Sequence, residues 1–176
     1  MLIVGAGAVG YEKLFFILKS SPEANVTVVA TWVSDELTEL LAQNDYNVNI
    51  IIKPFEASDI DGHDLIVAAT NDRPLNQYVQ QCAKAKGKLI NVADTPDLCD
   101  FYLGSIVTRG PLKVAISTNG QSPTFAKRFR QMLEAILPEE VEDLIANLKI
   151  IRDQLEGDFD EKVKQLNEVT ASLVEE

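Results

Sequence analysis

The stretch that decides the fold is Met1-Leu2-Ile3-Val4-Gly5-Ala6-Gly7-Ala8-Val9-Gly10. A short apolar run that ends in glycines is typical of a buried strand, and the apolar spacing after Gly10 indicates a helix to about Lys19. In this setting the first glycine allows a tight turn, the second lets a pyrophosphate approach the backbone, and the third lets helix pack on strand. Residues 5–10 therefore predict a dinucleotide-binding loop, with a tight turn that holds no ligand as the alternative.

Strands and helices alternate through the first hundred residues. Strands are predicted at residues 26–30, 48–52, 65–69 and 89–92, and helices at about 34–42 and 74–86. This alternation is typical of a parallel, doubly wound α/β sheet.

The pattern changes after Asp94. Two β-like runs, 102–107 and 112–117, flank the turn signal Arg109-Gly110-Pro111 and predict a hairpin. Ser122-Pro123 begins a helix that Pro138 ends, and two more helices are predicted at about 139–156 and 159–174. We therefore expect a Rossmann-like domain at 1–95, a hairpin and helix region at 96–137, and a small helical domain at 138–176.

Composition and charge exclude several classes of protein. The chain has 176 residues and a net charge of −11, which argues against a nucleic-acid partner. It has neither a long apolar run nor a signal segment, and its two cysteines make no disulfide framework or zinc site, so we expect a cytoplasmic protein with no membrane partner and no bound metal. His63, the only histidine, is expected on the surface.

Basic residues are concentrated in one segment of this acidic chain. Between positions 101 and 133 there is no acidic residue, but there are five basic ones: Arg109, Lys113, Lys127, Arg128 and Arg130. Such an island suggests a local anionic ligand. The alternative is a basic dimer face that meets an acidic face of the partner.

Polar residues follow several predicted strands at the carboxyl edge of the sheet, where folds of this kind bind ligands. Thr31 stands after the second strand, at the place where an acidic residue usually binds the adenosine ribose. No arginine follows to bind a 2′-phosphate. The residues alone therefore do not decide whether the cofactor is NAD or NADP. Thr70 and Asn71 either contact the nicotinamide ribose or form a polar loop that caps a helix. Asp94 either accepts a proton beside a bound nicotinamide or simply begins a loop.

Together these motifs resemble the precorrin-2 dehydrogenase family, the amino-terminal module of siroheme synthases. The resemblance runs from Leu2 to about Pro138. The glycine stretch and Ala68-Ala69-Thr70-Asn71-Asp72 are its less specific parts. Its specific parts are Asn91-Val92-Ala93-Asp94-Thr95-Pro96-Asp97-Leu98-Cys99-Asp100-Phe101 and the segment from Gly110-Pro111-Leu112 through Ala115-Ile116-Ser117-Thr118-Asn119-Gly120-Gln121-Ser122-Pro123.

The resemblance implies a homodimer that uses NAD⁺ to oxidise precorrin-2 to sirohydrochlorin in siroheme biosynthesis. It implies Asp94 as the catalytic residue, and a dimerisation role for the region after the Rossmann domain. The implied cofactor-binding residues are Gly5, Ala6, Gly7, Ala8, Val9, Gly10, Thr31, Thr70, Asn71, Asn91 and Val92. The substrate carries many carboxylates, and the residues expected to bind it are Arg109, Lys113, Ser117, Thr118, Asn119, Lys127 and Arg128.

Two alternatives remain open beside this interpretation. Some family members also insert Fe²⁺ into sirohydrochlorin, and the same aspartate is implicated in that step. A non-catalytic NAD-sensing module would need the glycine loop but neither Asp94 nor a basic substrate pocket. Family members usually carry a further segment before the first strand, so a truncated start is also expected here.

Overall fold

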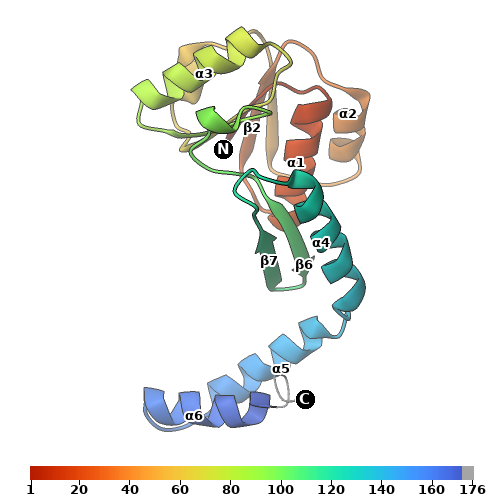
Figure 1. Cartoon of the computed structure of the whole chain (residues 1–176), viewed down its shortest axis with the longest axis vertical. Helices are drawn as coiled ribbons and strands as arrows, with labels where there is room; N and C mark the ends of the chain where they lie inside the picture. Colours follow the sequence, from red (N-terminus) through yellow and green to blue (C-terminus); the bar gives the residue numbers. More distant parts are fainter. Residues whose placement is uncertain (172–176) are drawn as a thin grey trace.

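A computed structural model describes residues 1–171, and Figure 1 shows three parts arranged along its length. A sheet with helices on both faces is followed by a hairpin with one long helix, and then by two further helices. The strands of the sheet are β1 (Leu2–Val4), β2 (Val26–Ala30), β3 (Val48–Ile52), β4 (Leu65–Ala68) and β5 (Leu89–Val92). The helices around it are α1 (Ala8–Ser20), α2 (Asp35–Ala42) and α3 (Arg73–Ala85), with 3₁₀ turns at Ala57–Ile60 and Pro96–Leu98.

The sheet is wholly parallel and has the order β3-β2-β1-β4-β5. The chain therefore reverses its direction of winding between β1 and β4, and the loops after these two strands lie side by side at the carboxyl edge. This reversal is where folds of this class form their ligand crevice. The predicted α/β fold and its parallel sheet are confirmed.

The core of the sheet domain forms because its central strands are apolar on both faces. Leu2 and Val4 point to one side and Ile3 to the other, and all three are buried. The Ile3 side packs against Leu14 of α1, and the opposite side packs against Val79 of α3. Burial on both faces explains why the strands read as continuous apolar runs without alternation.

The second part is an antiparallel hairpin, β6 (Ser105–Arg109) and β7 (Leu112–Ile116), covered by α4 (Pro123–Ile136). The predicted hairpin is confirmed, although β6 starts later than expected. Gly104 precedes it because the backbone there approaches β7 so closely that a Cβ atom would lie 2.7 Å from the carbonyl oxygen of Ile116. Ser122 caps α4, as predicted, by accepting a hydrogen bond from Phe125 N at 3.2 Å.

The third part consists of α5 (Val141–Gln154) and α6 (Phe159–Thr170), separated at Gly157. Both helices were expected, and the end predicted for the second, residues 172–174, lies outside the described residues. Within residues 1–171, no helix combines the length and the apolar character needed to cross a membrane.

His63, expected on the surface, is partly exposed but also makes contacts within the fold. Its ring is half-buried, and its nitrogens lie 3.1 Å from the Asp59 carbonyl oxygen and 3.1 Å from the Thr27 hydroxyl. The ring therefore ties the turn before β4 to β2.

Candidate functional site

The glycine loop joins β1 to α1 at the carboxyl edge of the sheet, and its shape excludes side chains. Gly5 has a φ of +105°, and a Cβ atom on it would lie 2.6 Å from the Ala69 carbonyl oxygen. A Cβ on Gly10 would collide with the Gly5 carbonyl oxygen. These contacts supply the physical reasons for the first and third glycines that the sequence pattern predicted.

A cleft of about 580 Å³ lies over this loop and over the N-terminus of α1. Gly7 is the N-cap of α1, and the first turn of this helix contains no acidic residue. The positive end of the helix dipole and its unpaired N–H groups therefore face the cleft. Helix N-termini of this kind bind phosphate groups. The residues present therefore fit the pyrophosphate of a dinucleotide. Of the predicted cofactor residues, the following line this cleft: Gly5, Ala6, Gly7, Ala8, Val9, Thr31, Thr70 and Asn71.

Sequence reasoning missed two residues that line the cleft just after β2 and β3, the end of β2 being where folds of this class contact the ribose. Trp32 follows Thr31, is 61% exposed, and lies 3.3 Å from the position of a Cβ on Gly7. Lys53 directly follows β3 and lines the same cleft. Both come immediately after strands that end at the carboxyl edge, and this position is the signal that could have identified them.

The loop after β4 is held in place by Asn76, a buried residue of α3 that the sequence did not single out. Asn76 Oδ1 accepts hydrogen bonds from the Thr70 backbone N–H at 3.2 Å and from the Thr70 hydroxyl at 2.7 Å. Asn76 Nδ2 donates to the Thr70 carbonyl oxygen at 2.9 Å. The helix thereby fixes Thr70 and the adjoining Asn71 over the cleft.

Asp94 lies at the tip of the turn after β5, with its side chain exposed. Its φ of +56° is in the left-handed region, where aspartate is among the few side chains tolerated. Strained backbone of this kind is concentrated at functional sites. Asp94 lines a second cleft of about 270 Å³, which shares Thr70 and Asn71 with the nucleotide cleft and adds Arg73.

The segment after Asp94 folds back on β5 through Cys99 and Asp100. The Val92 N–H donates to Cys99 Sγ at 3.2 Å, and the Cys99 thiol donates to the Val92 carbonyl oxygen at 3.2 Å. Asp100 accepts from the Ile90 N–H at 3.1 Å and pairs with Lys84. The hydrogen bond from Lys84, and then that from the backbone, hold the pKa of Asp100 below its ordinary value. These contacts fix the turn that carries Asp94.

Two of the predicted cofactor residues, Asn91 and Val92, line neither cleft. Asn91 is buried and donates a hydrogen bond to the Phe101 carbonyl oxygen at 2.8 Å, while Val92 belongs to the apolar core. Gly10 is likewise absent from the cleft lining, because it faces the backbone of Gly5. These three residues support the loops and strands around the clefts without lining them.

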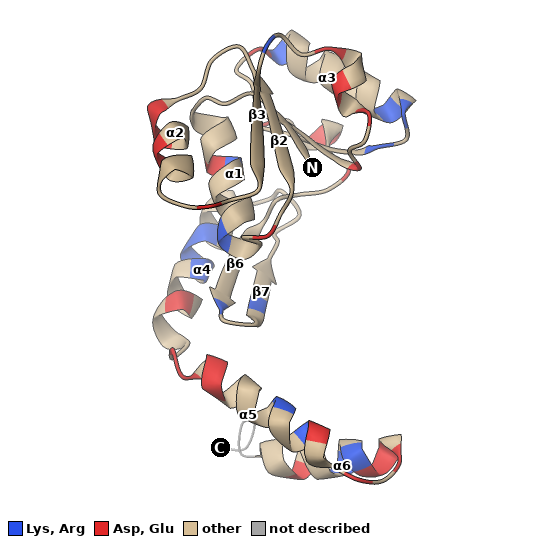
Figure 2. Ribbon diagram, turned by 180° about the vertical axis from the view of Figure 1, so that it is seen from behind, with Lys and Arg blue, Asp and Glu red and all other residues tan. Residues whose placement is uncertain are grey.

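The predicted substrate residues fall into two groups. Ser117, Thr118 and Asn119 lie in the loop between β7 and α4, and a Cβ on Gly120 of this loop would lie 4.0 Å from the Pro96 side chain. This loop therefore lies beside the turn that carries Asp94, and Lys127 and Arg128 follow it in the first turns of α4. Asn119 also has a left-handed backbone, with φ of +50°. Figure 2 shows that the upper part of α4, next to the sheet domain, is basic, whereas α2 and the start of α5 are acidic.

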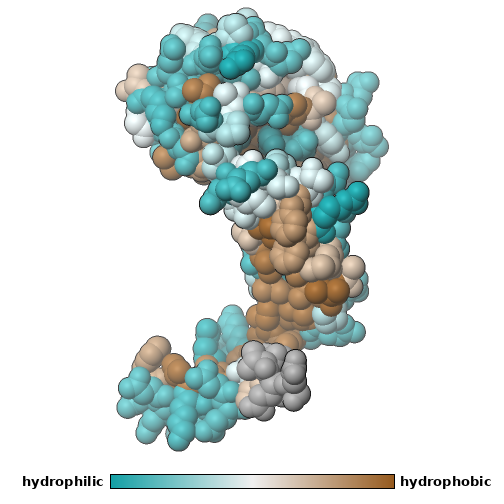
Figure 3. All heavy atoms as spheres, in the orientation of Figure 1, coloured by the Kyte–Doolittle hydropathy of each residue, from teal (hydrophilic) through white to brown (hydrophobic). Residues whose placement is uncertain are grey.

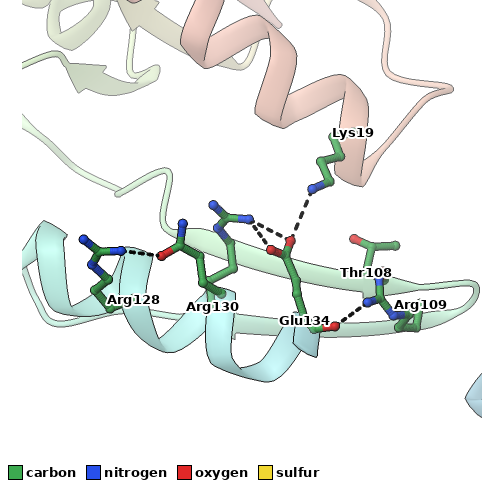
Figure 4. Close-up of polar contacts among 7 residues, drawn as sticks. Lys19, Thr108, Arg109, Arg128, Arg130 and Glu134 are labelled. Atoms are coloured by element: carbon green, nitrogen blue, oxygen red, sulfur yellow. Dashed lines mark hydrogen bonds and ion pairs between the residues drawn. The ribbon is translucent and has the colours of Figure 1, made fainter. Parts of the chain in front are cut away.

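Arg109 and Lys113 lie at the other end of the hairpin, next to its turn. Arg109 donates a hydrogen bond to the carbonyl oxygen of Glu134 at 2.6 Å (Figure 4). It also donates to the carbonyl oxygen of Leu137 at 3.4 Å, so it satisfies the C-terminus of α4. Within one chain, the structure does not bring Arg109 and Lys113 to Asp94.

A polar cluster connects the sheet domain with α4. Glu134 accepts hydrogen bonds from Arg130 at 2.7 Å and from Lys19 at the end of α1 at 3.2 Å (Figure 4). Burial raises the pKa of Glu134, but these two cations outweigh it and hold the pKa below its ordinary value. The Arg130 guanidinium also lies 5.8 Å from the ring centre of Phe16 on α1. The two parts of the chain are therefore joined by charge as well as by packing.

Among residues 1–171, no group of three or more His, Cys, Asp or Glu side chains is placed to hold a metal ion.

Over most of its length the chain is similar to several siroheme synthases. It is 38% identical over 164 residues to a siroheme synthase of Methylococcus capsulatus, covering 93% of this chain and 32% of that protein. It is 36% identical over 158 residues to a siroheme synthase of Vesicomyosocius okutanii, covering 90% of this chain and 33% of that protein. The chain thus spans about a third of the length of the curated relatives it matches.

A solved structure titled "SirC, precorrin-2 dehydrogenase" superimposes with a TM-score of 0.75 at 27% identity, over 96% of this chain and 82% of that one. Residues 109–136 match the family described as "Sirohaem biosynthesis protein central". Residues 1–105 match the family described as "Putative NAD(P)-binding". These matches confirm the resemblance predicted from the sequence, and because the last of them covers more than half of the chain, the chain belongs to this NAD(P)-binding family.

Proposed function

We propose that this chain oxidises precorrin-2 to sirohydrochlorin with NAD⁺ as the hydride acceptor. The observation that carries the proposal is that the cleft of Asp94 and the nucleotide cleft share Thr70 and Asn71, so a carboxylate adjoins the dinucleotide site. The likeness to a structure titled precorrin-2 dehydrogenase and to siroheme synthases supports the same activity.

The reaction removes the equivalent of a hydride and a proton from the substrate. NAD⁺, when bound, supplies the hydride acceptor. The exposed Asp94 carboxylate accepts the proton as the hydride leaves, or orients the carbon that loses it. The left-handed backbone at Asp94 directs this carboxylate from the tip of a turn that Cys99 and Asp100 hold to the sheet.

The substrate would bind through its carboxylates to cations around Asp94. Arg73, which lines the Asp94 cleft, is an additional candidate that sequence reasoning missed, and its guanidinium suits bidentate carboxylate contacts. The loop at 117–119 adds polar groups, and Lys127 and Arg128 add positive charge at the start of α4.

We also propose that the protein is a homodimer that pairs through α4 and the hairpin. Figure 3 shows an apolar surface over this part of the molecule. On α4, large apolar side chains remain exposed in the single chain: Phe125 at 59%, Phe129 at 36%, Met132 at 47% and Ile136 at 62%. A continuous apolar patch of this kind marks an interface. The partner would also explain why Arg109 and Lys113 lie far from Asp94 of their own chain.

Cys82 and Cys99 are both free thiols, in keeping with a reducing compartment, and we keep the cytoplasm as the proposed location.

The test compares the wild type with Asp94→Asn, using precorrin-2 generated enzymatically and NADH absorbance as the readout. We expect NADH from the wild type only, with NAD⁺ affinity retained in the variant. The affinity can be measured by fluorescence of Trp32, the only tryptophan, because it lines the nucleotide cleft. A folded, NAD⁺-binding wild type that forms no NADH would refute the activity and favour the sensor alternative.

A further inference from the structure

The ribose end of the nucleotide cleft contains a lysine that is already paired with two carboxylates. Lys53 Nζ lies 3.0 Å from Glu56 Oε2 and 2.8 Å from Asp59 Oδ1. Among the described residues that line this cleft, Lys53 is the only cation. Its ammonium group is therefore the one side-chain cation of this lining that a negatively charged group on the ribose can meet.

Lys53 reaches this position through strand register. Ala30, the last residue of β2, is paired with Ile52, the last residue of β3, and the Lys53 N–H donates to the Ala30 carbonyl oxygen at 3.0 Å. Lys53 is thus beside Thr31 and Trp32. The end of β2 is where dinucleotide-binding folds place the group that contacts the ribose 2′-hydroxyl or the 2′-phosphate.

Asp59 holds Lys53 in this arrangement. The Asp59 side chain is only 11% exposed, and its second oxygen, Oδ2, accepts a hydrogen bond from the Glu56 N–H at 2.8 Å. The hydrogen bonds from Lys53 to Asp59 and then to Glu56 raise the pKa of the lysine, which keeps it charged and paired. One ammonium faces two carboxylates, so the cluster has a net negative charge.

From this geometry we propose that the Lys53–Glu56–Asp59 cluster selects NAD over NADP, because its net negative charge opposes a 2′-phosphate and its one cation is occupied. The inference rests on the proposed nucleotide site but does not depend on precorrin-2 oxidation. A 2′-phosphate would have to displace Lys53 from its carboxylates, whereas a 2′-hydroxyl can be accommodated by the neighbouring Thr31.

The experiment titrates the intact protein with NAD⁺ and with NADP⁺ and follows Trp32 fluorescence, so that binding is measured without turnover. For the wild type we expect NADP⁺ to bind on the order of tenfold more weakly, the size of a single-charge effect at a partly exposed site. Higher salt should narrow this difference, because screening weakens repulsion between charges but leaves steric exclusion unchanged.

Three variants locate the effect. Glu56→Gln removes one carboxylate and should tighten NADP⁺ binding several-fold while leaving NAD⁺ binding unchanged. Glu23→Gln makes the same change of charge at an exposed site before β2, at the amino end of the strands and away from the cleft. This variant should change the affinity for neither NAD⁺ nor NADP⁺. Lys53→Gln leaves the two carboxylates alone and should weaken NADP⁺ binding further.

The opposite behaviour of Lys53→Gln would overturn the proposal. If the wild type binds both nucleotides equally and Lys53→Gln loses only NADP⁺, the lysine binds the 2′-phosphate and the cluster does not reject it. Equal effects of Glu56→Gln and Glu23→Gln would overturn it as well. If neither nucleotide binds the folded wild type, this inference and the proposed cofactor site both fail; binding of NAD⁺ without turnover would refute only the proposed reaction.

Discussion

Replacing Asn76 by alanine should loosen the loop that connects the two clefts. The substitution removes three hydrogen bonds to Thr70, two accepted and one donated, from a side chain that is only 6% exposed. At about 1 kcal/mol for each bond, the loss is about 3 kcal/mol. Alanine recovers roughly 0.6 kcal/mol through its higher helix propensity, so the free energy of unfolding should fall by about 2 to 3 kcal/mol.

The assay is urea unfolding followed by circular dichroism, with Gln77→Ala as the control. Gln77 is the next residue of the same helix and is exposed, so its replacement should change stability by less than about 0.5 kcal/mol. A second measurement, hydrogen exchange, should show faster exchange of the Thr70 amide in Asn76→Ala. The affinity for NAD⁺ should fall as well, because Thr70 and Asn71 line the nucleotide cleft.

If Asn76→Ala loses no more stability than Gln77→Ala and the Thr70 amide stays protected, Asn76 does not hold this loop in place. That result would mean that the loop keeps its shape through the Asp72 cap of α3, which accepts a hydrogen bond from Leu75 N at 3.1 Å.

Three further predictions concern separate parts of the site. Gly10→Ala should abolish NAD⁺ binding and lower the melting temperature, because the new methyl group meets the Gly5 carbonyl oxygen; normal binding would contradict this packing. Arg73→Gln should raise the KM for precorrin-2 and leave NAD⁺ affinity unchanged, and an unchanged KM would exclude Arg73 from substrate binding. Asp100, whose pKa is lowered by Lys84 and a backbone N–H, stabilises the fold above the carboxyl pKa of the unfolded chain, about 3.9, and this contribution is lost as pH falls through the lowered folded value. Asp100→Asn should therefore flatten the acid limb of a plot of stability against pH, and an unchanged limb would show that the pair with Lys84 contributes nothing.

Local pattern was enough to predict the sheet domain. The strands at 26–30 and 48–52 have the predicted bounds, because short apolar runs between breakers specify both their type and their length. Ser122 was recognisable as the residue that begins α4, because a cap depends on residues only three positions away. The turn that carries Asp94 was placed correctly at the carboxyl edge.

The residues that sequence reasoning missed or misplaced depend on contacts between distant segments. Asn76 reads as one more polar position on a helix, and only the folded loop shows that it binds Thr70. Asn91 was assigned to the cofactor through the resemblance to the family, but its side chain donates a hydrogen bond to the Phe101 carbonyl oxygen. Arg109 was grouped with the other cations by its position in the sequence. In the fold it lies at the turn of the hairpin, away from the loop at 117–119, and its guanidinium caps α4.

Helix α1 has a further consequence for the evolution of this chain. Its first turn forms the floor of the nucleotide cleft, and its last turn places Lys19 beside Glu134. With 13 residues at a rise of about 1.5 Å each, the helix is a spacer of roughly 20 Å between these two ends. One inserted residue would rotate everything after it by about 100° and turn Lys19 away from its partner. Insertions and deletions should therefore be absent from this helix.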